Sequence, residues 1–250
     1  MQNIIGLWAH MRARSTAFLR MMLERGDVFV VHEPFSSLLD DGTVQVPDGS
    51  GGKVQVATEK ELIAQLRVLA RRKPVFFKDT VEHRYSYLFE NSDDVADIIH
   101  TFIVRDPAQA INSIFNMKAN ITSAEVGYEH LYEIFNLSRL LSSRKPIVVD
   151  SAALVADPKY VIKEYCRRVG LPFRPNALTW QPGARPEWKR TQRWHEDVSN
   201  SSGFNGAIGS YRDTVDNNML LNGFLRYHNS FYLRLLQHSF SFDAEMAHSK

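Results

Sequence analysis

The sequence predicts an α/β fold in three layers, with helices covering both faces of a mostly parallel central sheet. Short apolar runs alternate with stretches of helical period from Asn3 to Leu171, and this alternation produces parallel strands joined by crossover helices. The run 28–32 does not alternate between apolar and polar residues, as in strands that are buried on both faces. Most of the apolar runs end in charged residues, and ligands bind at the carboxyl ends of parallel strands.

The first elements follow from local patterns. An apolar run predicts a strand at 4–8, and the stretch of helical period after the next turn stops at Gly26. The run 28–32 is expected to be a strand buried on both faces because it does not alternate. Valines two residues apart in the Gly-, Asp- and Pro-rich segment 40–58 indicate a mobile loop or small hairpin, which we expect to form a lid over the site. Leucines on one face predict a helix over 59–72.

The later elements carry start and stop signals. Aspartate followed by proline predicts helix starts at Pro107 and Pro158, and the second of these helices ends at Gly170. Beyond Pro172 the chain is irregular, and the tail after Ser239 is expected to fray. The remaining expected elements are strands at 74–78, 98–104 and 146–150 and helices at 85–91, 124–141 and 216–237.

Length and composition limit the classes of function. We expect one domain over 1–250, with an α/β core over 1–173 and an irregular and helical part over 174–250 that completes the site. A net charge of +2, from 30 basic and 28 acidic residues, argues against nucleic-acid or membrane partners. The one cysteine, Cys166, excludes an intrachain disulfide. No leader pattern is present and no apolar run approaches about 20 residues, so we expect a cytoplasmic protein. The oligomeric state is left open.

The turn after the first strand is small, polar and basic. It contains Arg12 and Arg14, followed by the hydroxyls of Ser15 and Thr16. A helix N-terminus offers unpaired N–H groups and partial positive charge, and guanidinium groups fit phosphate oxygens. The turn therefore predicts a phosphorylated ligand, with solvated arginines in an ordinary turn as the alternative. It lacks the glycines and the lysine that a nucleoside triphosphate loop needs.

A second basic residue ends the strand 98–104. Arg105 leaves this strand at the ligand edge, and Ser113 lies about two turns into the next helix. The two side chains are placed to hold a phosphate from two directions. The alternative is that Arg105 forms an ion pair with Asp106 or Asp150.

The basic turn resembles the 5′-phosphosulfate loop of sulfotransferases, typically Pro-Lys/Arg-Ser-Gly-Thr-Thr, or Pro-Arg-Ser-Arg-Ser-Thr in bacterial members. Met11 stands in place of the family's proline, and Arg12 takes the catalytic basic position. Arg14 takes the usual glycine position, and Ser15-Thr16 take the hydroxyl positions.

Two further segments extend this resemblance to about two-thirds of the chain. Arg105 with Ser113 resembles the family's 3′-phosphate motif, and residues 147–173 resemble its segment of strand, Asp-Pro helix and Leu-Gly-Leu-Pro. The resemblance implies a sulfotransferase with a P-loop-like fold and a phosphosulfate-binding loop.

The implied reaction uses 3′-phosphoadenosine 5′-phosphosulfate (PAPS) as donor. The sulfuryl group would pass directly to a hydroxyl or amine of a small-molecule acceptor, with no metal and no covalent intermediate. Arg12 would stabilise the leaving phosphate. The residues that the resemblance places at the donor are Arg12, Ala13, Arg14, Ser15, Thr16, Arg105 and Ser113.

The acceptor needs a group that takes its proton. Some bacterial and Golgi members place a glutamate at the end of the second strand, and Glu33 resembles it. We expect burial to raise the pKa of Glu33 into a useful range. The alternative is that Glu33 pairs with Arg12 or Arg14 and organises the turn. His32 and His83 are the other candidate bases.

The C-terminal part lacks the family's Arg-Lys-Gly-x-x-Gly-x-Trp box. Lys189 and Arg190, among further arginines and tryptophans, are the expected substitutes at the 3′-phosphate, with a solvated basic loop as the alternative. His195 is expected to be structural because no second histidine stands at ligand spacing. Two other functions stay open. One is a small-molecule kinase or other phosphotransferase, in which Asp79 would bind magnesium, and the other is a non-catalytic nucleotide-binding domain.

Overall fold

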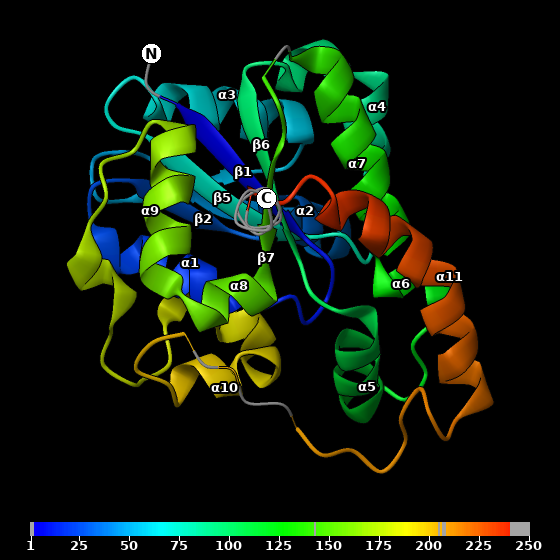
Figure 1. Ribbon diagram of the computed structural model, residues 1–250. Coiled ribbons are helices and arrows are strands. Elements are labelled where there is room, and N and C mark those ends of the chain that lie inside the picture. The colour runs from blue at the N-terminus through cyan, green and yellow to red at the C-terminus, as the bar shows by residue number, and fades with distance from the viewer. Residues whose placement is uncertain (1–2, 143, 205, 207–208, 241–250) are drawn as a thin grey trace, which may run out of the picture.

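The computed structural model describes residues 3–142, 144–204, 206 and 209–240. Its centre is a five-stranded parallel sheet in the order β2-β5-β1-β6-β7, which confirms the predicted fold class (Figure 1). The strands of this sheet are β1 (Ile4–Ala9), β2 (Phe29–His32), β5 (Val75–Thr80), β6 (Ile98–Val104) and β7 (Ile147–Asp150), and β3 (Val44–Pro47) and β4 (Lys53–Val56) form a separate hairpin.

Helices cover both faces of the sheet. The α-helices are α1 (Ser15–Arg25), α2 (Pro34–Asp41), α3 (Glu59–Leu69), α4 (Ser86–Glu90), α5 (Pro107–Met117), α6 (Ser123–Val126), α7 (Tyr128–Leu141), α8 (Ser151–Ala156), α9 (Pro158–Val169), α10 (Glu196–Ser199) and α11 (Met219–Leu236). Short 3-10 helices occur at η1 (Ser92–Val95), η2 (Pro175–Leu178) and η3 (Pro186–Trp194). α1 and α9 pack on one face, and α3, α4, α7 and α11 pack on the other (Figure 1).

Each strand supplies two hydrophobic cores because successive side chains point to opposite faces of a sheet. Ile5 and Leu7 of β1 belong to the core that packs on α1 and α9, whereas Ile4 and Trp8 belong to the core on the other face. With both faces covered and all strands parallel, the carboxyl ends of the strands meet at one edge. This edge carries the candidate site.

The order of the strands places β2 at an edge of the sheet, where Phe29, Val30 and His32 are half-buried and Val31 is fully buried. Both faces of this strand are nevertheless covered, because Phe29 and Val31 pack in one core and Val30 packs against the other. The expected burial on both faces is therefore found, to the partial extent that an edge strand allows. An apolar run contains no information about which strands lie beside it.

The segment after β2 also differs from expectation. Residues 34–41 form α2, which begins with proline at its first position and ends at Gly42 with a φ of 71°. Part of the segment 40–58 forms the hairpin β3–β4, which was one of the two predicted outcomes. Val44, Val46 and Val56 insert into the core. Of the segment 40–58, all of it described, only Asp40, in α2, lines the cavity at the strand ends, so the hairpin itself does not form the expected lid.

The predicted helix over 124–141 is divided at Gly127, which has a φ of 90° and separates α6 from α7. Beyond Pro172 the structure is largely irregular, as expected, until α11. Of the tail, Phe240 is buried rather than frayed, and residues 241–250 lie outside the described part of the chain. No described helix combines the length and the apolar composition needed to cross a membrane.

Gly127 allows us to predict the cost of a side chain beside the site. A Cβ atom at this position would lie 2.9 Å from the carbonyl oxygen of Val81. We expect Gly127→Ala to lower the free energy of unfolding by about 3 kcal/mol, through left-handed backbone strain and overpacking together. Gly26→Ala is the matched control, because Gly26 has a φ of 70° and open space around it. Urea unfolding of both variants measures the difference, and equal losses would contradict a contribution from Val81.

Candidate active site

A cavity of about 780 Å³ lies at the carboxyl ends of the strands. Its lining comes from the loop between β1 and α1, from the ends of β2, β5 and β6, and from a C-terminal segment that begins in η3. The structure therefore brings together candidates that the sequence placed far apart. Those that line the cavity are Arg12, Ala13, Arg14, Ser15, Thr16, Glu33, His83, Arg105 and Ser113.

The β1–α1 loop and the first turn of α1 form one wall of the cavity. Arg12 and Arg14 have left-handed φ angles of 62° and 67°, a conformation that costs a non-glycine residue about 1 kcal/mol. This conformation accounts for the glycine that sulfotransferase loops usually carry where Arg14 stands. No side chain caps α1, so the N–H groups of its first turn, at Ser15 and Thr16, are available to an anion.

Arg12 connects three segments of the site. Its Nε donates to Ser113 Oγ at 2.8 Å, its Nη1 donates to the carbonyl oxygen of Trp194 at 2.9 Å, and its Nη2 forms an ion pair with Asp197 at 2.6 Å. Ser113, which was predicted to act together with Arg105, is thus hydrogen-bonded to Arg12, and both Ser113 and Arg105 line the cavity. The sequence analysis did not identify Asp197, although it stands three residues after a tryptophan in a basic, aromatic stretch.

Arg105 lies against the same loop and is buried. Its Nη1 donates to the carbonyl oxygen of Arg12 at 3.1 Å, its Nε donates to Gln109 Oε1 at 3.2 Å, and its backbone N–H donates to His10 Nε2 at 3.0 Å. Burial, together with the positive charges of Arg14 and Arg12, lowers the pKa of Arg105 to about 10. This side chain is held in place and surrounded by like charge.

The alternative ion pair of Arg105 with an aspartate is not formed. Asp106 accepts the backbone N–H of Gln109 at 3.0 Å and caps α5, and Asp150 accepts that of Ala152 at 3.0 Å and caps α8. Among the residues that the structure describes, no carboxylate forms an ion pair with Arg105 or Arg14, and burial lowers the pKa of Arg14. Arg12, Arg14 and Arg105 thus line one cavity together with Arg193, and of the first three only Arg12 has a paired carboxylate among the described residues.

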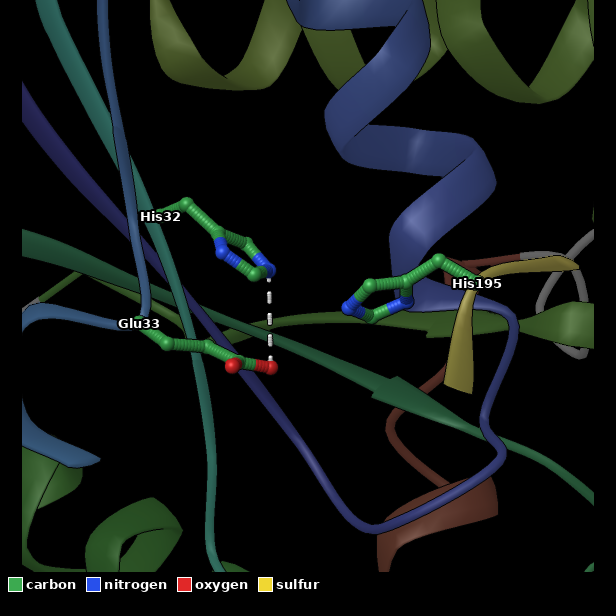
Figure 2. A group of neighbouring side chains, drawn as sticks. All are labelled: His32, Glu33 and His195. Carbon is green, nitrogen blue, oxygen red and sulfur yellow. Dashed lines mark ion pairs between the residues drawn. The ribbon is translucent and has the colours of Figure 1, made fainter. Parts of the chain in front are cut away.

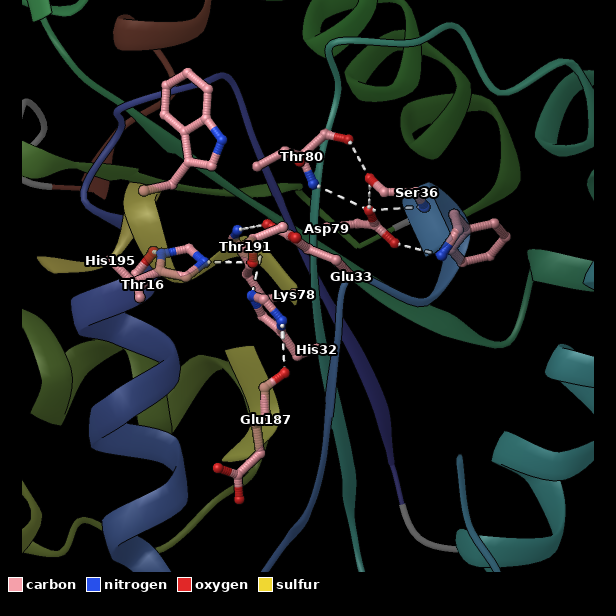
Figure 3. Close-up of polar contacts among 12 residues, drawn as sticks. Thr16, His32, Glu33, Ser36, Lys78, Asp79, Thr80, Glu187, Thr191 and His195 are labelled. Carbon is pink, nitrogen blue, oxygen red and sulfur yellow. Dashed lines mark hydrogen bonds and ion pairs between the residues drawn. The ribbon is translucent and has the colours of Figure 1, made fainter. Parts of the chain in front are cut away.

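Glu33 is buried where β2 meets α2, with a φ of 45°. Its Oε1 lies 2.5 Å from Lys78 Nζ and 3.5 Å from His32 Nε2 (Figure 3). The alternative pairing of Glu33 with Arg12 or Arg14 is therefore wrong. The expected raised pKa is also wrong: burial alone would raise the pKa of Glu33, but the attraction of His32 and Lys78 outweighs it and holds the pKa well below its ordinary value.

His32, Glu33 and His195 face one another, with candidate ligand atoms within 4.8 Å of each other (Figure 2). Ligand spacing in the sequence did not reveal this group, because its histidines are far apart along the chain. The candidate ligand atoms of Glu33 and His195 nevertheless already have partners within the protein. Glu33 binds Lys78, and the two ring nitrogens of His195 are hydrogen-bonded to Thr16 Oγ1 at 2.9 Å and Thr191 Oγ1 at 2.8 Å. Burial lowers the pKa of His195 to about 3, so it is a neutral residue that positions Thr16.

Asp79 has a structural role. Its carboxylate accepts the backbone N–H groups of Phe35 at 2.6 Å and Ser36 at 3.2 Å, and the Ser36 hydroxyl at 2.7 Å, and so caps α2 (Figure 3). It is completely buried, and burial together with the charge of Glu33 raises its pKa to about 7. The magnesium ligand that a kinase would need is therefore not offered to the cavity by this residue.

Two neighbouring residues after β5 face the cavity. His83, a predicted base, forms an ion pair with Asp40 at 3.2 Å, and both side chains are partly exposed. Glu82 also lines the cavity and was missed by the sequence analysis. The sequence offered one signal for Glu82, its position just beyond the end of a strand. His83 was assigned as the candidate base instead, because imidazole is the commoner base.

The predicted closing residues cannot be compared with the structure. The backbone of Lys189 and Arg190 lies in η3, but their side chains are outside the described part of the chain. Near them, Trp188 is completely buried in the core, and Arg193 stacks over Trp194 at 5.0 Å and lines the cavity. The basic, aromatic segment thus supplies both a core residue and a wall of the site.

A family model described as "Sulfotransferase domain" matches residues 2–234. Two Arabidopsis thaliana proteins, branched-chain-amino-acid aminotransferase-like proteins 2 and 1, are each 24% identical, over 208 and 239 residues that cover 81% and 90% of this chain. The chain spans 36% and 42% of the lengths of these relatives.

Two solved structures share the fold. The sulfotransferase domain from the Synechococcus PCC 7002 olefin synthase has a TM-score of 0.56 and 13% identity, over 91% of this chain and 95% of that domain. The sulfotransferase domain from the curacin biosynthetic pathway has a TM-score of 0.52 and 14% identity, over 84% of this chain and 94% of that domain. Similarity at these identities extends to the fold and not to substrates.

The buried pair of Glu33 and Lys78 yields a stability prediction. We expect Glu33→Gln to lower the free energy of unfolding by about 3 kcal/mol at pH 7, because Lys78 is left buried without its partner. The folded-state pKa of Glu33 is lowered from 4.5, so the stabilisation is present above that pH and is lost as pH falls through the folded-state pKa. The deficit of the variant should therefore shrink in acid.

Urea unfolding followed by tryptophan fluorescence at pH 7 and pH 4 tests this prediction. The matched control is the double variant Glu33→Gln with Lys78→Met, which removes both charges and should recover much of the loss. A single variant as stable as the wild type at pH 7 would show that the ion pair does not stabilise the fold.

Proposed function

The chain belongs to the sulfotransferase domain family, whose model spans it almost throughout, and from this premise we propose that it transfers a sulfuryl group from PAPS to a small-molecule acceptor. The acceptor atom is a hydroxyl oxygen or an amine nitrogen, and the transfer is a direct in-line displacement. In this proposal the C-terminal part after residue 173 completes the site of a single domain. Residues from Thr191 to Tyr211 in the cavity lining support it.

The observation that carries the proposal is the meeting of three guanidinium groups with an uncapped helix N-terminus. Arg12, Arg14 and Arg105 line the same cavity as the first turn of α1. Like charges that repel one another at close range favour a ligand with several negative charges. PAPS carries such charge at two separate groups. In the proposal, the α1 turn binds the 5′-phosphosulfate, and Arg105 with Ser113 binds the 3′-phosphate.

The proposed reaction needs positioning and charge stabilisation. The acceptor atom forms a bond to sulfur, the bond from sulfur to the bridging phosphate oxygen breaks, and negative charge grows on the 5′-phosphate. Arg12, which contacts Ser113 and the C-terminal segment, is the proposed stabiliser of that charge, and Ser15, Thr16 and the helix N–H groups assist it. An arginine keeps its proton and so serves as a fixed charge.

The proton of the acceptor must go to a base, and the transfer is proposed to need no metal. Glu33, His32 and His83, the candidates from the sequence, all lie near the ends of β2 and β5. Glu33 would accept a proton only against the attraction of Lys78, 2.5 Å away. A kinase would instead depend on a divalent cation, and the buried position of Asp79 does not favour it.

Binding of the reaction product tests the donor site. We expect Arg105→Ala to weaken the binding of 3′-phosphoadenosine 5′-phosphate (PAP) by roughly 10- to 100-fold, since one charged, partly buried hydrogen-bonding group is lost. Isothermal titration calorimetry measures the dissociation constant. Arg167→Ala is the matched control, because Arg167 is 69% exposed on α9, outside the cavity. An unchanged dissociation constant in Arg105→Ala would remove Arg105 from the donor site.

Turnover tests the proposed role of Arg12. We expect Arg12→Ala to lower the rate of PAP release from PAPS by roughly 100-fold, the usual cost of losing one group that stabilises transition-state charge. The rate is measured with a panel of phenols, alcohols and amines, with and without EDTA. If EDTA abolished wild-type turnover, metal-free transfer would be contradicted. A kinase or another phosphotransferase would then be the better proposal.

A further inference from the structure

The ends of β2 and β5 carry carboxyl groups that face the cavity. Glu33 is paired with Lys78, and Asp40 is paired with His83. Glu82 differs from both. Its carboxyl group accepts hydrogen bonds from Thr80 and from its own backbone N–H, while its Oε2 is shielded from solvent and has no hydrogen-bond partner among the described residues. The side chain lines the cavity. Because a carboxylate that is short of donors costs free energy when buried, a ligand in the cavity that offers it an O–H or N–H would lower that cost.

The backbone before Glu82 fixes its position beside the arginine-bearing loop. The N–H of Val81 donates to the carbonyl oxygen of Ala9, the last residue of β1, at 3.0 Å. The carbonyl oxygen of Val81 is hydrogen-bonded to His130 Nδ1 of α7 at 3.0 Å. The segment that carries Glu82 is thus attached to the residue from which the phosphosulfate-binding loop departs.

Electrostatics distinguish Glu82 from Glu33. Burial raises the pKa of Glu82 and the negative charge of Glu33 raises it further, while a hydrogen bond to Thr80 and the charge of Lys78 act in the opposite direction. The pKa of Glu33 is lowered instead. A proton acceptor works best when its pKa lies near the operating pH, so Glu82 is the better base of the two.

We propose that Glu82 accepts the proton of the acceptor during sulfuryl transfer. The inference rests on the proposed function and adds the acceptor side of the same site. The acceptor O–H or N–H binds to the Glu82 carboxylate where it lines the cavity, and its oxygen or nitrogen forms the bond to sulfur. The bond from sulfur to the bridging oxygen breaks and its electron pair stays on the 5′-phosphate of PAP. The proton goes to Glu82, which releases it to solvent.

In this arrangement Glu33 and Lys78 have a positioning role. Glu33 holds the Lys78 ammonium at the end of β5, four residues before Glu82. Its negative charge also favours the protonated form of Glu82, as required of a group that must take a proton. Glu33 thus raises the pKa of the proposed base, Glu82, and does not itself take the proton.

The experiment compares Glu82→Gln with the wild type and with Glu90→Gln, a matched control on the exposed side of α4. The probe is PAPS with water and with the same phenols, alcohols and amines as acceptors, followed as PAP release across pH. We expect Glu82→Gln to lose roughly 100-fold or more in kcat, with PAP affinity and the unfolding midpoint unchanged. The wild-type rate should rise with pH as Glu82 loses its proton, and this rise should be absent in Glu82→Gln.

Chemical rescue gives a second readout. Formate, a small carboxylate, should restore part of the rate in Glu82→Ala in proportion to its concentration, which a merely structural residue would not allow. Wild-type kcat in Glu82→Gln, or a pH-dependent rise that persists there and disappears in Glu33→Gln, would overturn the inference. If the wild type transfers to no acceptor or does not bind PAP, the proposed function itself fails.

Discussion

The crowding of positive charge at the β1–α1 loop is the constraint on which the site depends. Burial lowers the pKa values of Arg14 and Arg105, so keeping these groups charged costs free energy. The fold limits that cost because a residue that supports the loop is uncharged. His10, whose pKa burial lowers to about 3, accepts the N–H of Arg105 and stacks on Tyr128 at 3.9 Å. An uncharged imidazole anchors the loop without adding to the repulsion.

Much of the fold could be predicted from the sequence because local rules decide it. Short, mostly apolar runs located all five strands of the sheet, and Asp-Pro pairs located the starts of α5 and α9. The edge position of β2 could not be predicted, because strand order depends on which helices cross over which face. The break at Gly127 was also missed, since its backbone is left-handed where it approaches Val81, a contact between distant segments.

The candidate site, like the fold, could be predicted from the sequence only in part. Arg12 and Arg105 could be assigned because they follow strands at the edge where ligands bind, and that edge follows from parallel topology. The partner of Glu33 could not, since Lys78 becomes its neighbour only when β2 pairs with β5, in a register that places His32 opposite Lys78. Glu82 could not be predicted either, because it belongs to no motif and is distinguished only by its place in the wall of the folded cavity.

The ion pair of Arg12 with Asp197 ties the C-terminal segment to whatever anion the loop binds. The carboxylate of Asp197 is 78% exposed, so water can solvate it well after separation. An anion that approaches Arg12 exchanges one negative partner for another, and its affinity reflects the difference between the two. By reciprocity, an anion that binds Arg12 weakens the ion pair by which this segment contacts the loop. Asp197, which forms part of the cavity wall, therefore competes with a bound anion for Arg12.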